Sequence, residues 1–276
     1  MILLSALVAL GLWLWWGNIS PVTTVYPYAD ARVPEGFDGF RIAQISDLHD
    51  ARLGRDNAWL LRETARAKPD VIVITGDGFD AHRVDLPRSL SAIEGLRQIA
   101  PVYYVTGNHE AARMASDYRT FRRALKEMDV TVLEDAAAEI RRGGDTLTVV
   151  GMQDIGFHEG GYTQRRQLLQ DRLTALVPVE GFSLTLAHRP ELIDCYEAAG
   201  APLVFCGHAH GGQVRLPFIG GLAAPGQGLF PKYTAGIYRQ GNTAMVVSRG
   251  IGNSVAPLRV NNRPEIVLLE LRRESQ

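Results

Sequence analysis

The sequence predicts an α/β fold, and three observations support this prediction. Short apolar segments typical of strands alternate with longer segments that have helical spacing, as at Leu60, Leu61 and Ala65. The segment VIVIT at 71–75 is a continuous β-branched run, which is typical of a strand buried on both faces. Asp, His or Asn directly follows several strands. In open α/β sheets, ligand sites form beyond the carboxyl ends of the strands.

Length and composition indicate a globular protein. The chain has 276 residues, 46% of them hydrophobic, which suits one large domain or two small ones with a sizeable core. Its 29 Lys and Arg balance 30 Asp and Glu, which argues against disorder and against a nucleic-acid-binding surface. The two cysteines, Cys195 and Cys206, are too few for a disulfide framework and lack the spacing of a zinc ribbon.

The N-terminal segment differs from the rest of the chain, because residues 1–16 contain no charged side chain. A helix over residues 2–16 would be about 22 Å long. A hydrocarbon core is about 30 Å thick, so a span needs help from the uncharged residues 17–28. Three tryptophans near its end suit an interfacial aromatic belt. We expect an uncleaved anchor, with a cleaved signal peptide and a buried helix as the alternatives.

The chain is expected to have three parts. Residues 1–20 form the transmembrane anchor or signal-like segment, residues 21–38 a linker with three prolines, and residues 39–276 the folded domain. The predicted location is therefore a membrane, reached through a single N-terminal anchor. The side of the membrane is left open, because no Lys or Arg flanks the segment before Arg32. The oligomeric state is left open as well.

After the linker, predicted strands and helices alternate along the chain, and the C-terminal third is richer in strands. Strands are assigned to short apolar runs and helices to longer segments with apolar spacing; a Gly143-Gly144 turn separates two of the strands. The predicted strands are 41–46, 71–75, 102–106, 130–133, 147–150, 182–187, 203–206, 213–216, 244–248 and 265–271. The predicted helices are 56–68, 86–99, 114–128, 163–176 and 190–199.

Five of these strands are followed by polar residues that can bind metal or transfer protons. The five motifs are Asp47-Leu48-His49, Gly76-Asp77, Gly107-Asn108-His109-Glu110, His188 and Gly207-His208-Ala209-His210. Five strand ends can deliver these side chains into one crevice. Alternate residues of an extended chain point the same way, so each spaced pair, Asp47/His49 and His208/His210, is expected to reach a single ion.

The motifs contain a ligand set that indicates two divalent metal ions. Imidazole and carboxylate groups without thiolates suit Mn, Fe, Zn, Co or Ni. The candidate ligands are Asp47, His49, Asp77, Asn108, His188, His208 and His210. They are too many for one tetrahedral ion, but two ions about 3.5 to 4 Å apart, bridged by a carboxylate, would use them all. Such a pair clamps a phosphoryl oxygen and generates a bridging hydroxide that displaces an ester oxygen in line.

The five motifs resemble the calcineurin-like metallophosphoesterase superfamily, whose pattern is D-x-H, G-D, G-N-H-[ED], H and G-H-x-H. The match runs from Arg41 to His210 in the right order. The tract from Gly211 through Gly252 is also similar to the small bacterial membrane-anchored phosphodiesterase branch. This resemblance implies a four-layer αββα sandwich, in which two packed mixed β-sheets are flanked by helices. It makes residues 39–276 a metallophosphoesterase domain.

The resemblance also implies how the ligands divide between the ions. One ion would be held by Asp47, His49 and His210. The other would be held by Asn108, His188 and His208, with Asp77 bridging the two.

Two further residues take catalytic roles by the same resemblance. His109 would protonate the leaving-group oxygen, a role that suits histidine because its unperturbed pKa lies near 6.5. Asp80 would orient His109 and favour its charged form.

One departure from the superfamily bears on the substrate. Phosphoprotein phosphatases of this superfamily read G-D-x-x-D-R-G, and the arginine binds phosphate; residues 76–82 read GDGFDAH, without that arginine. We therefore expect an enzyme that cleaves phosphodiester or pyrophosphate bonds in small molecules. The anchor and the apolar, Gly/Pro-rich stretch 216–238 motivate one alternative, hydrolysis of the pyrophosphate of a lipid-linked nucleotide such as UDP-diacylglucosamine.

Alternative interpretations remain open for one segment and for the whole chain. The stretch 216–238 is expected to be either a packed crossover between sheets or a rim of the site. Such a rim would contact a bilayer or a hydrophobic substrate. The whole chain can also be a non-catalytic scaffold for a partner, or a one-metal redox or structural protein. A scaffold would be expected to have lost ligands, whereas all seven are present.

Overall fold

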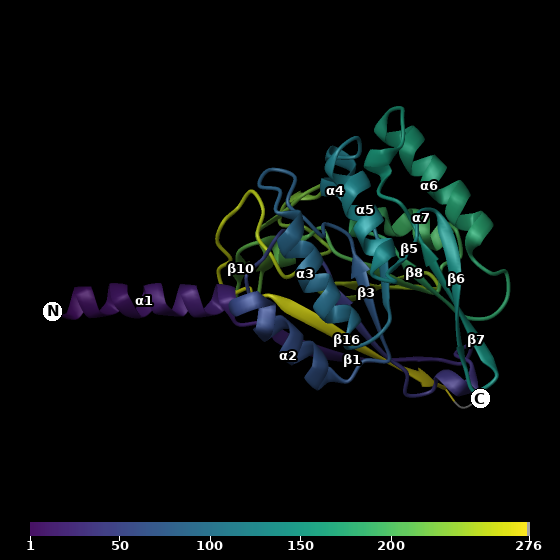
Figure 1. Ribbon diagram of the computed structural model, residues 1–276, viewed down its shortest axis with the longest axis horizontal. Helices are drawn as coiled ribbons and strands as arrows, with labels where there is room; N and C mark the ends of the chain where they lie inside the picture. Colours follow the sequence, from purple (N-terminus) through teal and green to yellow (C-terminus); the bar gives the residue numbers. More distant parts are fainter. Residues whose placement is uncertain (275–276) are drawn as a thin grey trace.

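Two six-stranded sheets form the centre of the structure, which is a computed structural model that describes residues 1–274 (Figure 1). The first sheet has β2 to β5 parallel to one another, with β16 antiparallel to β2 and β1 parallel to β16. In spatial order its strands are β1 (Val22–Asp30), β16 (Glu265–Arg273), β2 (Arg41–Ile45), β3 (Val71–Thr75), β4 (Val102–Val105) and β5 (Thr131–Val132).

The second sheet is also mixed. Four of its strands, β15, β9, β8 and β7, are parallel, and an antiparallel strand closes each edge. In spatial order its strands are β14 (Gly236–Gln240), β15 (Thr243–Val247), β9 (Leu203–Cys206), β8 (Ser183–Leu186), β7 (Asp145–Gly151) and β6 (Ala136–Arg142).

Helices cover the outer face of each sheet, so the protein has four layers. An apolar core between the sheets includes Val73 and Phe205. Outside the first sheet a second core, which includes Ile72 and Phe121, joins β3 to α2 (Ala58–Ala67), α3 (Leu86–Arg97) and α5 (Asp117–Glu127). A third core joins the second sheet to α6 (Tyr162–Leu176) and α7 (Ile193–Ala198). The predicted αββα sandwich is confirmed.

Short elements complete the chain around this sandwich. The 3-10 turns are η1 (Glu35–Phe37), η2 (Arg55–Asn57), η3 (Ile155–Phe157), η4 (Pro190–Leu192) and η5 (His210–Gly212). One short helix, α4 (Asn108–Ala112), directly follows β4. The stretch 216–238 is no single crossover, because it contains two small hairpins. Their strands are β10 (Arg215–Leu216) with β11 (Gly220–Gly221), and β12 (Ala223–Ala224) with β13 (Gly228–Leu229).

Three strands of the two large sheets were not expected from the sequence: β1, β6 and β14. The segment expected to be a linker instead contains β1, which pairs along its whole length with β16. Pro27 is compatible with β1 because this strand lies at the edge of the sheet, where only one side needs backbone hydrogen bonds. The sequence of β6, AAAEIRR, has weak strand propensity, and the hairpin with β7 imposes its conformation.

The N-terminal segment forms a single helix, α1 (Ile2–Ile19), that projects away from the sandwich (Figure 1). Its 18 residues correspond to about 27 Å. None of them is buried in the protein, and the helix is long and apolar enough to cross a membrane, a property that signal sequences share. The helix extends three residues beyond the expected 2–16, so its length approaches the thickness of a hydrocarbon core.

Candidate metal centre and active site

The five motifs lie at one edge of the sandwich because they follow strands whose carboxyl ends meet there. The strands β2, β3 and β4 of the first sheet precede the first three motifs, and β8 and β9 of the second sheet precede the other two. A short contact joins the sheets at this edge: His188 Nδ1 lies 2.7 Å from the backbone oxygen of Thr75. The site is therefore built between the two sheets, at the ends of their parallel strands.

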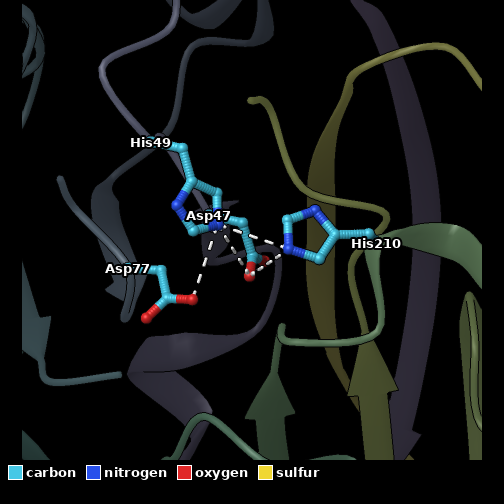
Figure 2. Close-up of side chains that lie close together, drawn as sticks. All are labelled: Asp47, His49, Asp77 and His210. Atoms are coloured by element: carbon cyan, nitrogen blue, oxygen red, sulfur yellow. Dashed lines mark hydrogen bonds and ion pairs between the residues drawn. The ribbon is translucent and has the colours of Figure 1, made fainter. Parts of the chain in front are cut away.

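One group of side chains consists of Asp47, His49, Asp77 and His210, all buried (Figure 2). Their ligand atoms all lie within 4.8 Å of one another. His49 Nε2 is 3.5 Å from Asp77 Oδ2 and 3.3 Å from His210 Nε2, and His210 Nε2 is 3.6 Å from Asp47 Oδ1. Two imidazole nitrogens and two carboxylates thus converge on one point, as ligands of a single cation do.

A second group shares Asp77 with the first. Asp77, His188 and His208 also have ligand atoms within 4.8 Å of one another, and all three are buried. His188 Nε2 lies 3.3 Å from Asp77 Oδ2 and 3.1 Å from Asn108 Oδ1. The structure therefore brings all seven sequence-derived ligands into two adjoining groups, with the Asp77 carboxylate in both.

The backbone brings these ligands together in a way that differs from the expected extended pairs. Asp47, His49, His208 and His210 all have positive φ, between 45° and 64°, and so does Asp77, at 54°. Asp and His are among the side chains that tolerate this left-handed conformation best, and such residues cluster at functional sites. Left-handed turns, not alternation along a strand, therefore make the two spaced pairs converge.

Two glycines allow the close approach of backbone to the carboxylates. A Cβ on Gly207 would lie 1.8 Å from Ser46 Oγ and 2.5 Å from Asp47 Oδ2. A Cβ on Gly107 would lie 2.2 Å from Asp77 Oδ1. Both contacts are far inside van der Waals distance, so these motif positions require glycine.

Burial sets the protonation of three histidines in a direction that favours metal binding. Burial lowers the pKa of His49 and of His208 well below the ordinary histidine value, and it also lowers the pKa of His210. A neutral imidazole keeps a lone pair for a metal, whereas a protonated ring has none. These three rings are therefore ready to bind a cation at neutral pH.

His188 and Asp77 form an oppositely charged pair. Burial opposes the charged form of His188, but the Asp77 carboxylate outweighs it and raises the pKa of His188 to about 10. Burial likewise opposes ionisation of Asp77, yet the nearby histidines, His188 foremost, hold its pKa well below the usual range. Asp77 is thus an anion whose charge must be balanced, which is the electrostatic requirement for a carboxylate between two cations.

The donor set fits a pair of divalent ions. It combines imidazole, carboxylate and amide oxygen without thiolate, which suits the ions from Mn to Zn. The two groups therefore suit two metal ions that share Asp77.

Glu191 is a candidate residue that the sequence analysis missed. It lies in η4, three residues after His188, and its side chain is 10% exposed. Neither carboxylate oxygen has a hydrogen-bond partner in the described part of the chain, although Arg189 Nη1 is 3.6 Å from Oε1. His208 Nε2 lies 3.9 Å from Oε1. Metal-bound histidines usually donate their second ring N–H to such a carboxylate.

Glu110 stabilises the loops that carry two of the motifs. It is fully buried and accepts hydrogen bonds from the backbone N–H groups of Asp77, Gly78 and Gly107, at 3.0, 2.8 and 2.6 Å. The hydroxyl of Tyr104 donates a fourth, at 2.7 Å. One carboxylate therefore ties the end of β3 to the end of β4.

His109 lies beside the metal-binding groups, but its closest partner is not the one expected. The backbone N–H of Ala81 donates to His109 Nδ1 at 2.8 Å, whereas Asp80 Oδ1 is 3.7 Å from that atom. Asp80 instead accepts from the backbone N–H of His82 and from Arg83. The expectation that Asp80 orients His109 did not include this backbone donor, which has no sequence signal because every non-proline residue has one.

A cleft of about 440 Å³ opens over these groups. Its polar lining includes Asp77, Asn108, His109, His208 and His210. We call its apolar lining residues, Ala223, Ala224, Pro225, Val255 and Ala256, the apolar wall. Among the lining residues that the structure describes, none is Lys or Arg. The volume lies within the range of small-molecule sites.

Comparison with known proteins agrees with this geometry. The family model for calcineurin-like phosphoesterase matches residues 40–212. The phosphodiesterase YaeI of Escherichia coli (strain K12) is 30% identical, over 84% of this chain and 82% of that protein. The metallophosphoesterase YkuE of Bacillus subtilis (strain 168) is 29% identical, over 91% of this chain and 85% of that protein.

A solved structure shows the same fold at low sequence identity. The crystal structure of TT1561 of Thermus thermophilus has a TM-score of 0.53 and 12% identity, over 77% of this chain and 90% of that chain. The family match spans most of the domain and includes the whole of both metal-binding groups. The chain belongs to the calcineurin-like phosphoesterase family and is a metal-dependent phosphoric ester hydrolase.

Proposed function

We propose that this protein hydrolyses phosphodiester or pyrophosphate bonds at the surface of a membrane, with α1 as its anchor and His109 as the general acid. The observation that supports the proposal best is the position of Asp77. Its carboxylate belongs to both metal-binding groups and lies 3.9 Å from His109 Nε2, at the cleft. Metal ligands and a proton donor therefore face the same small volume.

The seven ligands would hold two divalent ions, as the superfamily pattern divides them, with Asp77 between the ions. When bound, the ions supply Lewis-acid polarisation of the phosphoryl group and activation of water for in-line attack. The chain itself orients the ligands. The backbone N–H of His208 donates to Asp47 Oδ1 at 3.0 Å, and that of His109 donates to Asp77 Oδ1 at 2.9 Å. Because the His109 N–H binds Oδ1 of Asp77, Oδ2 of Asp77 remains available to face His49 and His188.

His109 would give its proton to the leaving-group oxygen. Its Nε2 faces the cleft, while Nδ1 faces the Ala81 N–H and the Asp80 carboxylate. The Ala81 contact holds the neutral ring with its proton on Nε2. In the charged form Nδ1 also carries a proton, so the Ala81 N–H would have to turn away and Asp80 Oδ1, now 3.7 Å from Nδ1, would become its acceptor. Asp80 is thus proposed to support the charged acid.

The charge of the cleft favours diesters over monoesters. A phosphomonoester carries up to two negative charges near neutral pH, whereas a diester carries one. No Lys or Arg lines the described cleft, and Ala81 occupies the position at which phosphoprotein phosphatases have their arginine. A site with few fixed positive charges can balance the single charge of a diester more completely than the two charges of a monoester.

A comparison of two chromogenic esters tests this proposal. Full-length protein loaded with Mn²⁺ is expected to hydrolyse bis(p-nitrophenyl) phosphate with a higher kcat/KM than p-nitrophenyl phosphate. Chelation should abolish the activity and Mn²⁺ should restore it. A preparation that binds two Mn²⁺ ions per chain yet hydrolyses neither ester would refute the enzymatic proposal, and a clear preference for the monoester would refute the diester assignment.

The apolar wall of the cleft supports a second candidate, a pyrophosphatase that acts on a lipid-linked nucleotide such as UDP-diacylglucosamine. The acyl chains of such a substrate would lie against the Ala223–Pro225 and Val255–Ala256 surfaces. Release of UMP from this lipid by the Mn²⁺-loaded protein would support this candidate. An unchanged lipid, under conditions in which the chromogenic diester is cleaved, would eliminate it.

A further inference from the structure

Two loops beside the cleft expose large apolar side chains. The tip of the β10–β11 hairpin carries Phe218, which is 109% exposed, and Ile219, at 62%. The loop 253–258 carries Val255, which is 81% exposed. Single exposed apolar residues need no explanation, but several at the tips of adjoining loops mark an interaction surface. We call Leu216, Phe218, Ile219, Val255 and Leu258 the apolar rim.

These loops adjoin the end of α1. The backbone N–H of Arg215 in β10 donates to Val260 O at 3.0 Å, and Val214 forms a parallel bridge to Val260. One residue earlier, Arg259 exchanges two hydrogen bonds with Asn18 of α1, at 2.8 and 2.9 Å. Figure 1 shows β10 on the side of the sandwich from which α1 projects. The apolar rim and the end of α1 are therefore connected through residues 259–260.

Buried and stacked arginines form this connection. Arg259 is 2% exposed and donates to Arg249 O and Gly252 O, both at 2.6 Å. The guanidinium of Arg263 lies 4.4 Å from the ring centre of Trp16 and donates to Ser20 O. These contacts hold the end of α1 against the part of the domain that carries the two loops.

The chemistry around the end of α1 matches a membrane interface. Tryptophans prefer the headgroup level of a membrane. Trp13, Trp15 and Trp16 lie in the C-terminal half of α1. The hollow next to Asn18 and Ile19 is lined by Arg52, Arg83 and Arg88, of which Arg83 and Arg88 also pair with Asp80 and Asp85. Arginines at this level attract anionic headgroups. If α1 spans a bilayer, these features place the membrane surface at the loops that carry the apolar rim.

We propose that the apolar rim inserts into the interface of the same bilayer that holds α1, so that the cleft opens at the membrane surface. Val255 belongs both to the rim and to the apolar wall of the cleft. The substrate class that fits this arrangement is an amphiphilic phosphodiester or pyrophosphate, with its apolar part in the bilayer and its phosphorus at the metal centre. The inference rests on the proposed anchoring by α1 and deepens the proposed function.

Site-specific fluorescence tests the insertion without any need for turnover. Cys195 and Cys206 are both buried, so a single introduced cysteine can be labelled with an environment-sensitive fluorophore. Full-length Phe218→Cys, Val255→Cys, Leu7→Cys and Val179→Cys proteins would be reconstituted in vesicles of phosphatidylcholine and phosphatidylglycerol. Val179 is a matched control because it is apolar and 102% exposed. It follows α6, which lies at the other end of the sandwich from α1 (Figure 1).

Labels at positions 218 and 255 are expected to shift to the blue and to be quenched by lipids with a headgroup-level spin label. The label at position 179 should show neither effect. Labels at 218 and 255 that behave like the one at 179 would overturn the inference, whatever position 7 reports. The label at position 7 tests the anchor separately. If that label is neither shifted to the blue nor quenched by a spin label on the acyl chains, α1 is not an anchor, and the claim that the rim shares the bilayer of α1 is overturned with it.

Kinetics provide a second, independent test. The double variant Phe218→Asp, Ile219→Asp is expected to lose about tenfold or more in hydrolysis of a vesicle-embedded phosphodiester, because two apolar side chains no longer partition into the interface. Hydrolysis of soluble bis(p-nitrophenyl) phosphate should be unchanged, because neither residue lines the cleft. Equal losses on both substrates, or no loss on vesicles, would contradict the proposal.

Discussion

Asp77 is the residue on which both metal-binding groups depend. Its Oδ2 lies 3.5 Å from His49 Nε2 and 3.3 Å from His188 Nε2, and its Oδ1 accepts the backbone N–H of His109. The same side chain therefore fixes the distance between the two groups and the distance of His109 from both. A change at Asp77 should disturb every function of the site, whereas changes at its neighbours should separate them.

His109→Ala is the change that separates proton transfer from metal binding. Because His109 is not among the ligand groups, the variant should still bind two metal ions per chain while kcat on a diester with a poor leaving group falls about 10²- to 10⁴-fold. Metal content by elemental analysis and steady-state kinetics provide the two readouts. His82→Ala is the matched control, since it removes an imidazole from the same cleft and should change kcat far less. Loss of metal in His109→Ala would contradict this role.

Glu191→Leu tests whether a buried carboxylate orients His208. Removal of the carboxylate should weaken binding of the second ion about 10- to 100-fold, and Glu191→Gln should recover part of the affinity because its amide oxygen still accepts a hydrogen bond. Titration calorimetry with Mn²⁺ measures both effects. The metal-free Glu191→Leu protein should be no less stable, because the lost carboxylate has no hydrogen-bond partner within residues 1–274 and Arg189 keeps its ion pair with Asp154. Unchanged metal affinity in the Leu variant would exclude this role.

At the scale of the elements, the site depends on how the ends of β3 and β4 are held together. Glu110 lies in α4, just after β4. Most of its hydrogen bonds are nevertheless accepted from the loop after β3 and from the turn before α4. Burial, together with the nearby Asp77 carboxylate, raises the pKa of Glu110. The four donors supply the compensation that a buried carboxylate requires.

Glu110→Ala is therefore expected to destabilise the metal-free protein by roughly 3 kcal/mol, because three backbone N–H groups lose their acceptor in a buried site. Urea unfolding measures the change. Tyr104→Phe removes only one donor to the same carboxylate and should cost about 1 kcal/mol. If the two variants were equally stable, Glu110 would not be the residue that connects the strand ends.

The elements also show what the sequence can and cannot reveal. Apolar runs such as Val71–Thr75 are visible because burial on both faces leaves a continuous signal. The strand β1 is not visible, because its alternation is weak and Pro27 is typical of a linker; its pairing with β16, more than 230 residues away in the chain, is a tertiary effect. The turn geometry of Asp47 and His49 is also hidden, since identical spacing fits an extended strand.

At the scale of the whole molecule, the two sheets meet at their carboxyl ends, and this arrangement explains why the motifs are so far apart in the sequence. The first sheet supplies Asp47, His49, Asp77 and Asn108, and the second supplies His188, His208 and His210. Residue types and chain order were sufficient to predict this convergence. Glu191 and the Ala81 N–H were not predictable, because their roles depend on distances across the fold and not on a local pattern.

The most direct test of the central claim is anomalous diffraction at the manganese edge from crystals of the Mn²⁺-loaded protein. The account predicts two anomalous peaks about 3.5 to 4 Å apart, one on each side of the Asp77 carboxylate. One peak should lie beside Asp47, His49 and His210, and the other beside Asn108, His188 and His208. A single peak, or peaks that Asp77 does not separate, would contradict the account.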